Sequence, residues 1–151
     1  MLNQHEGRST GLVWHEKMMW HDTGSGASEL PAGGWLEPGD HAVVVRTNYA
    51  TNLETPRAIG ADLDVVDLHY DGAWALDLER LAALVRPGTT RLISVTCPHN
   101  PTGTMLDLDT LHALVQLAER SGAVLLVDET YRDLTHDVPR PMAAALSPRA
   151  I

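Results

Sequence analysis

The stretch RLISVTCPHNPTGTMLDLDTLHALVQLAERSGAVLLVDETY, residues 91–131, decides the fold. It contains two short runs rich in apolar residues, at 91–96 and 123–127, which are typical of buried strands. Between them, Leu and Val recur every three or four residues from about 107 or 109 to 120, and this spacing predicts a helix with one apolar face. Gly122 follows as the residue that ends the helix. The stretch therefore predicts two parallel strands joined by a crossover helix.

The same alternation of strand and helix extends upstream. Strands are predicted at 41–46 and 63–68, and helices at 51–59 and 77–85. Pro56 lies inside the first of these helices, which indicates that this helix starts late or bends. Because continuously apolar strands alternate with helices, the predicted fold is α/β: a three-layer, mostly parallel sheet with helices on both faces.

The two ends of the sequence are patterned differently from this central part. Residues 1–35 show no sustained period and are broken by Gly and Pro, so they are predicted to form an irregular segment with a short helix near 12–20. Residues 36–151 are predicted to form one domain, with a last short helical piece at 142–146.

The composition excludes several functional classes. A formal net charge of −9 over 151 residues argues against nucleic acid and against an anionic membrane surface as partners. No apolar run is long enough for a membrane span, and the first twenty residues lack the apolar core of a leader. The single cysteine, Cys97, fits a reducing cytoplasm. We also expect no metal site, because His15, Glu16 and His21 do not have the spacing of metal ligands.

Polar segments follow three of the predicted strands. They are TNY at 47–49, CPHNPTG at 97–103 and DETY at 128–131. In a parallel sheet such segments meet at the carboxyl edge, where ligands bind. Each segment alone also has an ordinary structural interpretation: a turn for Asn-Pro-Thr-Gly, a helix cap for the Asp, and packing for the Tyr residues.

Taken together and in this order, the segments resemble the large domain of class I/II aminotransferases, the fold-type I enzymes that depend on pyridoxal 5'-phosphate (PLP). The resemblance extends from residue 36 to about residue 137 and implies a partial large domain of such an enzyme. The motifs that carry it are LEPGD at 36–40, Tyr49, IGAD at 59–62, DLERL at 77–81, HNPTG at 99–103 and VDETYRDL at 127–134.

The resemblance implies a PLP site at the carboxyl edge of the sheet. Asp128 matches the partner of the protonated pyridine nitrogen, where a carboxylate favours the charged ring. Asn100 and Tyr131 match the two donors to the phenolate oxygen of PLP. Tyr49 matches the aromatic residue that stacks on the pyridine ring.

The phosphate of PLP needs backbone N–H groups at the start of a helix. The resemblance implies that Gly26, Ala27 and Ser28, within GSGASE at 24–29, supply them. The breaker-rich stretch 30–34 departs from the family pattern, so a flexible Gly/Ser loop is an equal alternative.

The resembling family binds PLP as a Schiff base with a lysine that lies beyond the pyridine-pairing Asp. The only lysine in this sequence, Lys17, precedes the whole sheet and does not match it. Residues 146–151 resemble the strand that leads to that lysine, so the chain reads as truncated before it. No catalytic residue is therefore assigned.

The expected function is that of a PLP-dependent aminotransferase acting on an amino acid and a keto acid, here as a cytoplasmic fragment that is inactive alone. The resemblance also implies a homodimer. Two alternatives stay open at this point: a non-catalytic α/β module that binds PLP or a phosphorylated ligand, and a remnant of an incomplete gene. Titration with PLP followed by borohydride reduction separates the first alternative from an active enzyme, because binding without a covalent adduct favours the non-catalytic module.

Overall fold

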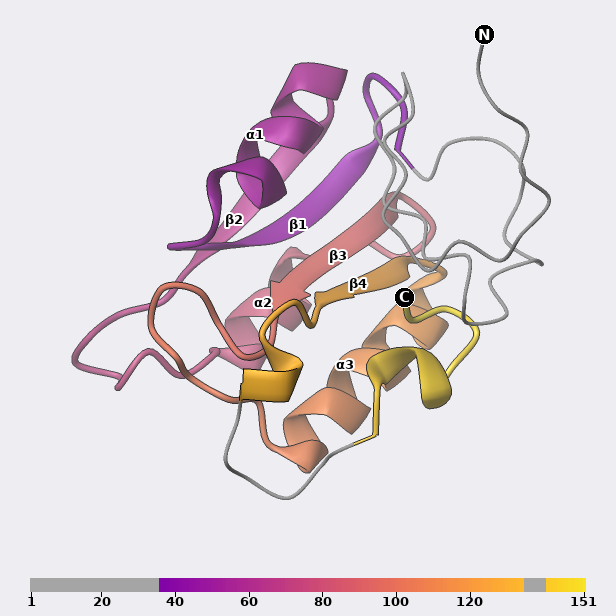
Figure 1. Ribbon diagram of the computed structural model, residues 1–151. Coiled ribbons are helices and arrows are strands. Elements are labelled where there is room, and N and C mark those ends of the chain that lie inside the picture. The colour runs from indigo at the N-terminus through magenta and orange to yellow at the C-terminus, as the bar shows by residue number, and fades with distance from the viewer. Residues whose placement is uncertain (1–35, 135–140) are drawn as a thin grey trace, which may run out of the picture.

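A four-stranded parallel sheet forms the centre of the computed structural model, which describes residues 36–134 and 141–151 (Figure 1). The strands are β1 (His41–Arg46), β2 (Asp62–Asp67), β3 (Thr90–Thr96) and β4 (Val124–Asp128). Their order is β2-β1-β3-β4, and each neighbouring pair is parallel. The prediction of an α/β fold with a mostly parallel sheet is confirmed.

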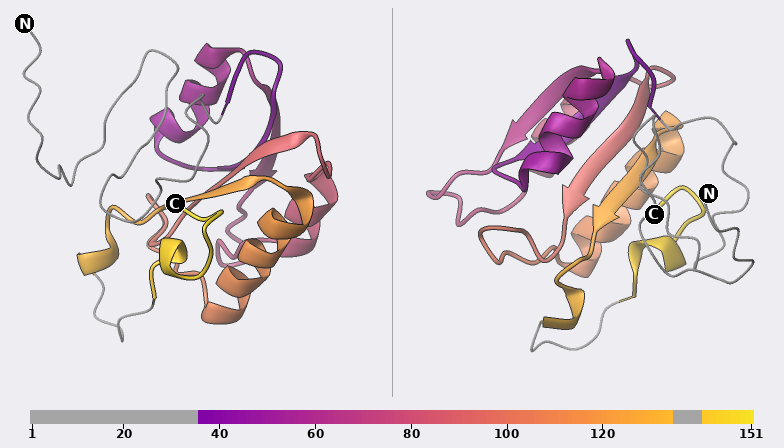
Figure 2. Two further views of the ribbon diagram at one scale, coloured as in Figure 1. Left: turned by 90° about the vertical axis from the view of Figure 1, so that its right-hand side faces the viewer. Right: turned by 45° about the horizontal axis from the view of Figure 1, so that its top comes forward.

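Helices cover both faces of this sheet. Helix α1 (Ala50–Ile59) lies on one face, and α2 (Leu78–Leu84) and α3 (Leu108–Ser121) lie on the other (Figure 2). Side chains alternate between the faces along each strand, so Val43 and Val45 join the core beneath α2 and α3 while Ala42 joins the smaller core beneath α1. The three-layer arrangement follows from this alternation.

Side-chain caps and glycines set the ends of the helices. The carboxylate of Asp77 accepts a hydrogen bond from the backbone N–H of Arg80 at 2.8 Å, and Asp107 accepts one from Thr110 at 2.7 Å. Asp107, not Asp109, is thus the cap of α3. Gly122 ends the same helix with φ at 81°, a backbone conformation that glycine adopts without a steric penalty.

Two details differ from the sequence-based expectation. Helix α1 begins at Ala50 and continues through Pro56, so the helix does not start late; the proline withholds one backbone donor without ending it. The short helical piece near 142–146 is a single 3₁₀ turn, Ala143–Ala145. Segment 1–35, with the short helix expected near 12–20, lies outside the described residues.

The main core lies between the sheet and the pair α2 and α3. Leu81, Ile93, Leu114 and Leu125 are fully buried there. Burying a side chain of this size stabilises the fold by about 1.5–3 kcal/mol relative to exposure. These contacts fix the strands and therefore the positions of the loops at their ends.

Residues near the end of the sequence extend the sheet beyond β4. The N–H of Leu125 donates to the carbonyl of Arg149 at 2.8 Å, and the N–H of Ile151 donates to the carbonyl of Leu125 at 2.9 Å. This pairing is an isolated parallel bridge between Leu125 and Ala150, and the strand expected within 146–151 is not formed. Among the described residues, α3 is the longest helix, and neither it nor any other is long and apolar enough to cross a membrane.

Candidate functional site

The carboxyl edge of the sheet collects the polar segments that the sequence singled out. Segments 47–49, 97–103 and 128–131 follow β1, β3 and β4, which are adjacent in the sheet. The register places Thr96 directly beside Asp128 at the last pair of β3 and β4. These segments therefore lie at one edge, as the topology of parallel strands requires.

Asp128 is half-buried at this edge and is held by groups from two different elements. Its Oδ1 atom accepts hydrogen bonds from both the backbone N–H and the hydroxyl of Thr130, the former at 3.1 Å. Its Oδ2 atom accepts one from Nδ2 of Asn52, on α1, at 3.0 Å. An ionised carboxylate has about four lone-pair sites, so these three donors leave acceptor capacity on Asp128.

Asn52 belongs to a small network of buried amide and hydroxyl groups. Its Nδ2 atom lies 3.3 Å from Oδ1 of Asn48 and 3.3 Å from Oγ1 of Thr96. The hydroxyl of Thr96 donates to Oδ1 of Asn48 at 3.0 Å, and the N–H of Tyr49 donates to the same oxygen at 2.7 Å. The Nδ2 atom of Asn48 is buried and has no hydrogen-bond partner among the described residues.

Sequence reasoning missed both asparagines. Asn48 lies within the segment 47–49 that it singled out, but only Tyr49 received a role. Asn52 follows four residues later, in the first turn of α1, whereas Asn48 lies in the loop before that helix. Two amide side chains directly after a buried strand are the signal that could have identified the pair.

The other predicted site residues occupy the same edge with different exposure. Tyr49 is the residue before α1 and is 58% exposed, and Tyr131 is 41% exposed after β4. Asn100 is half-buried in the turn after β3. The hydrogen bonds of Asn48 and Asn52 connect Asp128 to the loop of Tyr49; the roles of Tyr49, Asn100 and Tyr131 stay predictions.

The predicted phosphate-binding residues Gly26, Ala27 and Ser28 lie outside the described residues, as does Lys17.

The loop after β3 is held by its own hydrogen bonds. Nδ1 of His99 lies 2.8 Å from Oγ1 of Thr102, and the N–H of Gly103 donates to the carbonyl of His99 at 2.7 Å. Gly103 has φ at 74°, which explains a glycine at the end of HNPTG. Burial lowers the pKa of His99, and the backbone of Thr47 opposes this in part. Burial therefore favours the neutral form of the ring, which contributes to the shape of the loop.

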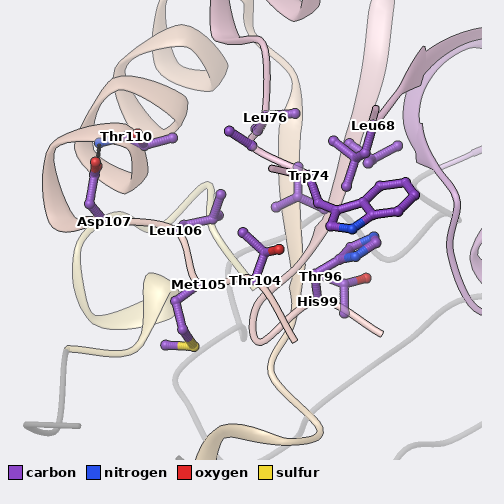
Figure 3. Close-up of a pocket in the computed structure, with 13 residues that line it drawn as sticks. Leu68, Trp74, Leu76, Thr96, His99, Thr104, Met105, Leu106, Asp107 and Thr110 are labelled. Carbon is purple, nitrogen blue, oxygen red and sulfur yellow. Dashed lines mark hydrogen bonds between the residues drawn. The ribbon is translucent and has the colours of Figure 1, made fainter. Parts of the chain in front are cut away.

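A cavity of about 110 Å³ lies beside this loop, on the face of the sheet that α2 and α3 cover (Figure 3). His99, Trp74 and Met105 are among its lining residues. None of Tyr49, Asn100, Asp128 and Tyr131 lines it. The cavity therefore does not contain the predicted site residues, and their roles toward a cofactor, that of Asp128 included, stay predictions.

Glu129, next to Asp128, links β4 to the later part of the chain. Its Oε1 atom accepts a hydrogen bond from the N–H of Ala143 at 3.3 Å, and its Oε2 atom lies 3.5 Å from the guanidinium of Arg132. Burial is the largest influence and raises the pKa of Glu129, against the lowering by Ala143 and Arg132. Asp128 and Glu129 thus have separate partners, and only Asp128 is joined to the asparagines.

These features fit a planar ligand with a cationic ring nitrogen. Asp128 offers an oriented carboxylate with spare acceptor capacity, Asn48 offers a buried donor without a partner, and Tyr49 offers an exposed aromatic face. A carboxylate stabilises a nearby cation, and an aromatic face stacks on a flat ring. The residues present at this edge therefore fit the pyridine ring of PLP.

The chain is similar to known proteins over most of its length. Residues 18–149 match the family model described as aminotransferase class I and II. The chain is 34% identical over 124 residues to a protein of Mycobacterium tuberculosis named "Probable N-succinyldiaminopimelate aminotransferase", covering 80% of this chain and 31% of that protein. It is 38% identical over 104 residues to capreomycidine synthase of Streptomyces vinaceus, covering 69% and 26%.

Solved structures give the same result. A PLP-dependent aminotransferase of Streptococcus suis superposes with a TM-score of 0.70 at 33% identity, over 76% of this chain and 30% of that one. The chain spans about a third or less of the length of the curated relatives it matches. On this match of motifs, fold and sequence, the chain belongs to the class I and II aminotransferases, whose cofactor is PLP.

Proposed function

We propose that residues 36–151 form the part of an aminotransferase large domain that binds the pyridine ring of PLP. The observation that carries the proposal is the anchoring of Asp128 by Thr130 and Asn52 at the carboxyl edge of the sheet. The whole protein would act on an amino acid and a keto acid, in the cytoplasm and as a homodimer.

In this proposal each residue has one task. Asp128 holds the proton on the pyridine nitrogen, because its negative charge favours the charged ring. Asn100 and Tyr131 donate hydrogen bonds to the phenolate oxygen, and Tyr49 fixes the plane of the ring. Gly26, Ala27 and Ser28 bind the phosphate. When bound, PLP withdraws electrons from the α-carbon of an amino acid.

The 151-residue chain alone is proposed to bind PLP reversibly and to transfer no amino group. Its single lysine, Lys17, precedes the sheet and matches no part of the family's site. An aminotransferase needs a lysine amine to hold the cofactor covalently and to move the proton of the substrate. This behaviour coincides with the second candidate function, a module that binds PLP or a phosphorylated ligand without catalysis.

A titration tests both parts of the proposal. The chain is titrated with PLP, reduced with borohydride and digested, and its peptides are then weighed; keto-acid formation is assayed in parallel with amino acids. We expect saturable binding that Asp128→Asn weakens, no modified peptide at a defined site and no turnover. Absence of binding would contradict the proposed site. Turnover would contradict the proposed inactivity.

A further inference from the structure

Asn52 connects two ends of the site that are distant in the sequence. It lies in the first turn of α1, is 4% exposed, and donates its Nδ2–H to Oδ2 of Asp128, which is 76 residues away. The other donors to Asp128 come from Thr130, two residues along the same loop. Among the described residues, the bond from Asn52 is the one that ties the carboxylate to another element, helix α1, so we expect it to resist rotation of the side chain.

The orientation of Asn52 is itself fixed by two further residues. Oδ1 of Asn48 faces three donors, from Tyr49, Thr96 and Asn52, which identifies it as the amide oxygen and not the nitrogen. Thr96 contacts both asparagines. We call Thr96, Asn48 and Asn52 the asparagine relay.

We propose that the asparagine relay positions Asp128 to receive the pyridine nitrogen of PLP before the cofactor arrives. This inference rests on the proposed function. Asn52 acts through Asp128 and is a positioning residue.

The chemistry of the relay suits this task. A neutral amide donor orients the carboxylate without cancelling its charge, so the full negative charge of Asp128 is available to the ring nitrogen. A Lys or Arg at position 52 would instead pair with Asp128 and compete with the cofactor. Preorganisation of this kind reduces the cost of ordering the site when a ligand binds.

The test uses pyridoxamine 5'-phosphate, the amine form of the cofactor, because it cannot form an imine with protein amines. Its affinity is measured by calorimetry for the unaltered chain, Asn52→Leu, Asp128→Asn and the double variant. Thr55→Val is the matched control, since Thr55 is buried one turn further along α1 and lies outside the relay. Circular dichroism and thermal unfolding report whether each variant is folded.

We expect Asn52→Leu to weaken binding about ten-fold, the range for losing a hydrogen bond to a charged group. In the Asp128→Asn background the same change should have little further effect, because Asn52 acts only through the carboxylate. Thr55→Val should bind like the unaltered chain. Equal losses in both backgrounds would overturn the inference, since they would indicate a general effect on folding.

Thr96→Val keeps the test decisive if Asn52→Leu does not fold. It removes the hydroxyl that donates to Asn48 while preserving the shape of the side chain. We expect a loss of about three-fold in affinity that is absent in the Asp128→Asn background. If the unaltered chain binds and neither relay variant weakens binding, the inference is wrong while the proposed function stands. If the unaltered chain does not bind, the proposed function itself is wrong.

Discussion

The two ends of the sheet both carry buried polar groups, but the groups are paired differently. At the amino end, His41 is 1% exposed; its Nδ1 lies 2.8 Å from Oγ1 of Thr90 and its Nε2 lies 3.1 Å from Oδ2 of Asp64. Arg86 extends this network with hydrogen bonds of 2.8 Å to both Asp62 and Asp64. We call these residues the amino-end network.

At the carboxyl end, the asparagine relay holds Asp128 but leaves one of its own polar atoms unpaired. Nδ2 of Asn48 is buried and makes no hydrogen bond within the described part of the chain. Folded proteins pair nearly all buried polar groups, so incomplete pairing marks a place where another group is expected. We therefore expect the amino end to serve stability and the carboxyl end to serve binding.

The largest expected effect tests the amino end. His41→Ala removes a fully buried side chain and leaves Thr90 and Asp64 without their ring partner. We expect the free energy of unfolding in urea to fall by about 3 kcal/mol, from the cavity and the lost hydrogen bonds together. The folded fraction should bind pyridoxamine 5'-phosphate with unchanged affinity.

The exposed His69 provides the matched control, because His69→Ala removes the same side chain from the surface. It should change stability by no more than about 0.5 kcal/mol. If His41→Ala weakened binding while leaving stability intact, the assignment of the amino end to stability would be wrong.

The second prediction concerns the carboxyl end, where a substitution should weaken binding and leave stability nearly unchanged. Tyr49 is the N-cap residue of α1, but its side chain is largely exposed and makes no capping hydrogen bond, so Tyr49→Ala should alter stability by less than about 0.5 kcal/mol. Loss of a stacking ring should weaken affinity for pyridoxamine 5'-phosphate about five-fold, since such contacts contribute on the order of 1 kcal/mol. Calorimetric titration and urea unfolding measure the two quantities.

Tyr49→Phe separates the ring from its hydroxyl group. A stacking role needs only the aromatic face, so the phenylalanine variant should bind like the unaltered chain. Weakening by Tyr49→Phe to the level of the alanine variant would show that the hydroxyl, and not the ring, carries the contact.

The sequence was sufficient for the fold because its signals are local. Short runs rich in apolar residues predicted each strand to within a residue, and Asp77, Asp107 and Gly122 marked helix ends through bonds to nearby backbone. The strand order β2-β1-β3-β4 depends on which strands pack side by side, which no local pattern states. The relay could not be predicted for the same reason, since Asn52 meets Asp128 only after β1, β3 and β4 have paired.

The roles predicted for the site residues came from the resemblance of the motifs to the aminotransferase family, because local sequence patterns do not determine them. Asp128 follows an apolar strand, a place where an Asp is also common as a cap, so its position alone predicts no cofactor. The spacing of HNPTG and DETY gave the residue its role through resemblance. The exposure of Tyr49 and Tyr131 had no sequence signal, because an aromatic residue at a sheet edge is equally compatible with packing.

The smallest expected effect compares one carboxylate from each end by its pH dependence. Burial tends to raise the pKa of Asp64, but hydrogen bonds from His41 and Arg86 and their charges outweigh it and lower the pKa below 3.8. The folded state then holds the proton less tightly than the unfolded state. The stability that Asp64 contributes is complete above pH 3.8 and is lost as the pH falls through the folded pKa.

The pKa of Glu129 is shifted in the opposite direction, because burial raises it above 4.5 despite Ala143 and Arg132. Its favourable contribution is complete below pH 4.5 and is lost as the pH rises through the folded pKa. Asp64→Asn should therefore reduce the loss of stability that accompanies a fall in pH below 3.8. Glu129→Gln, whose amide oxygen can still accept from Ala143, should reduce the loss of stability that accompanies a rise in pH above 4.5. Urea unfolding from pH 3 to 8 measures both, and shifts of the same sign would contradict the contrast between the two ends.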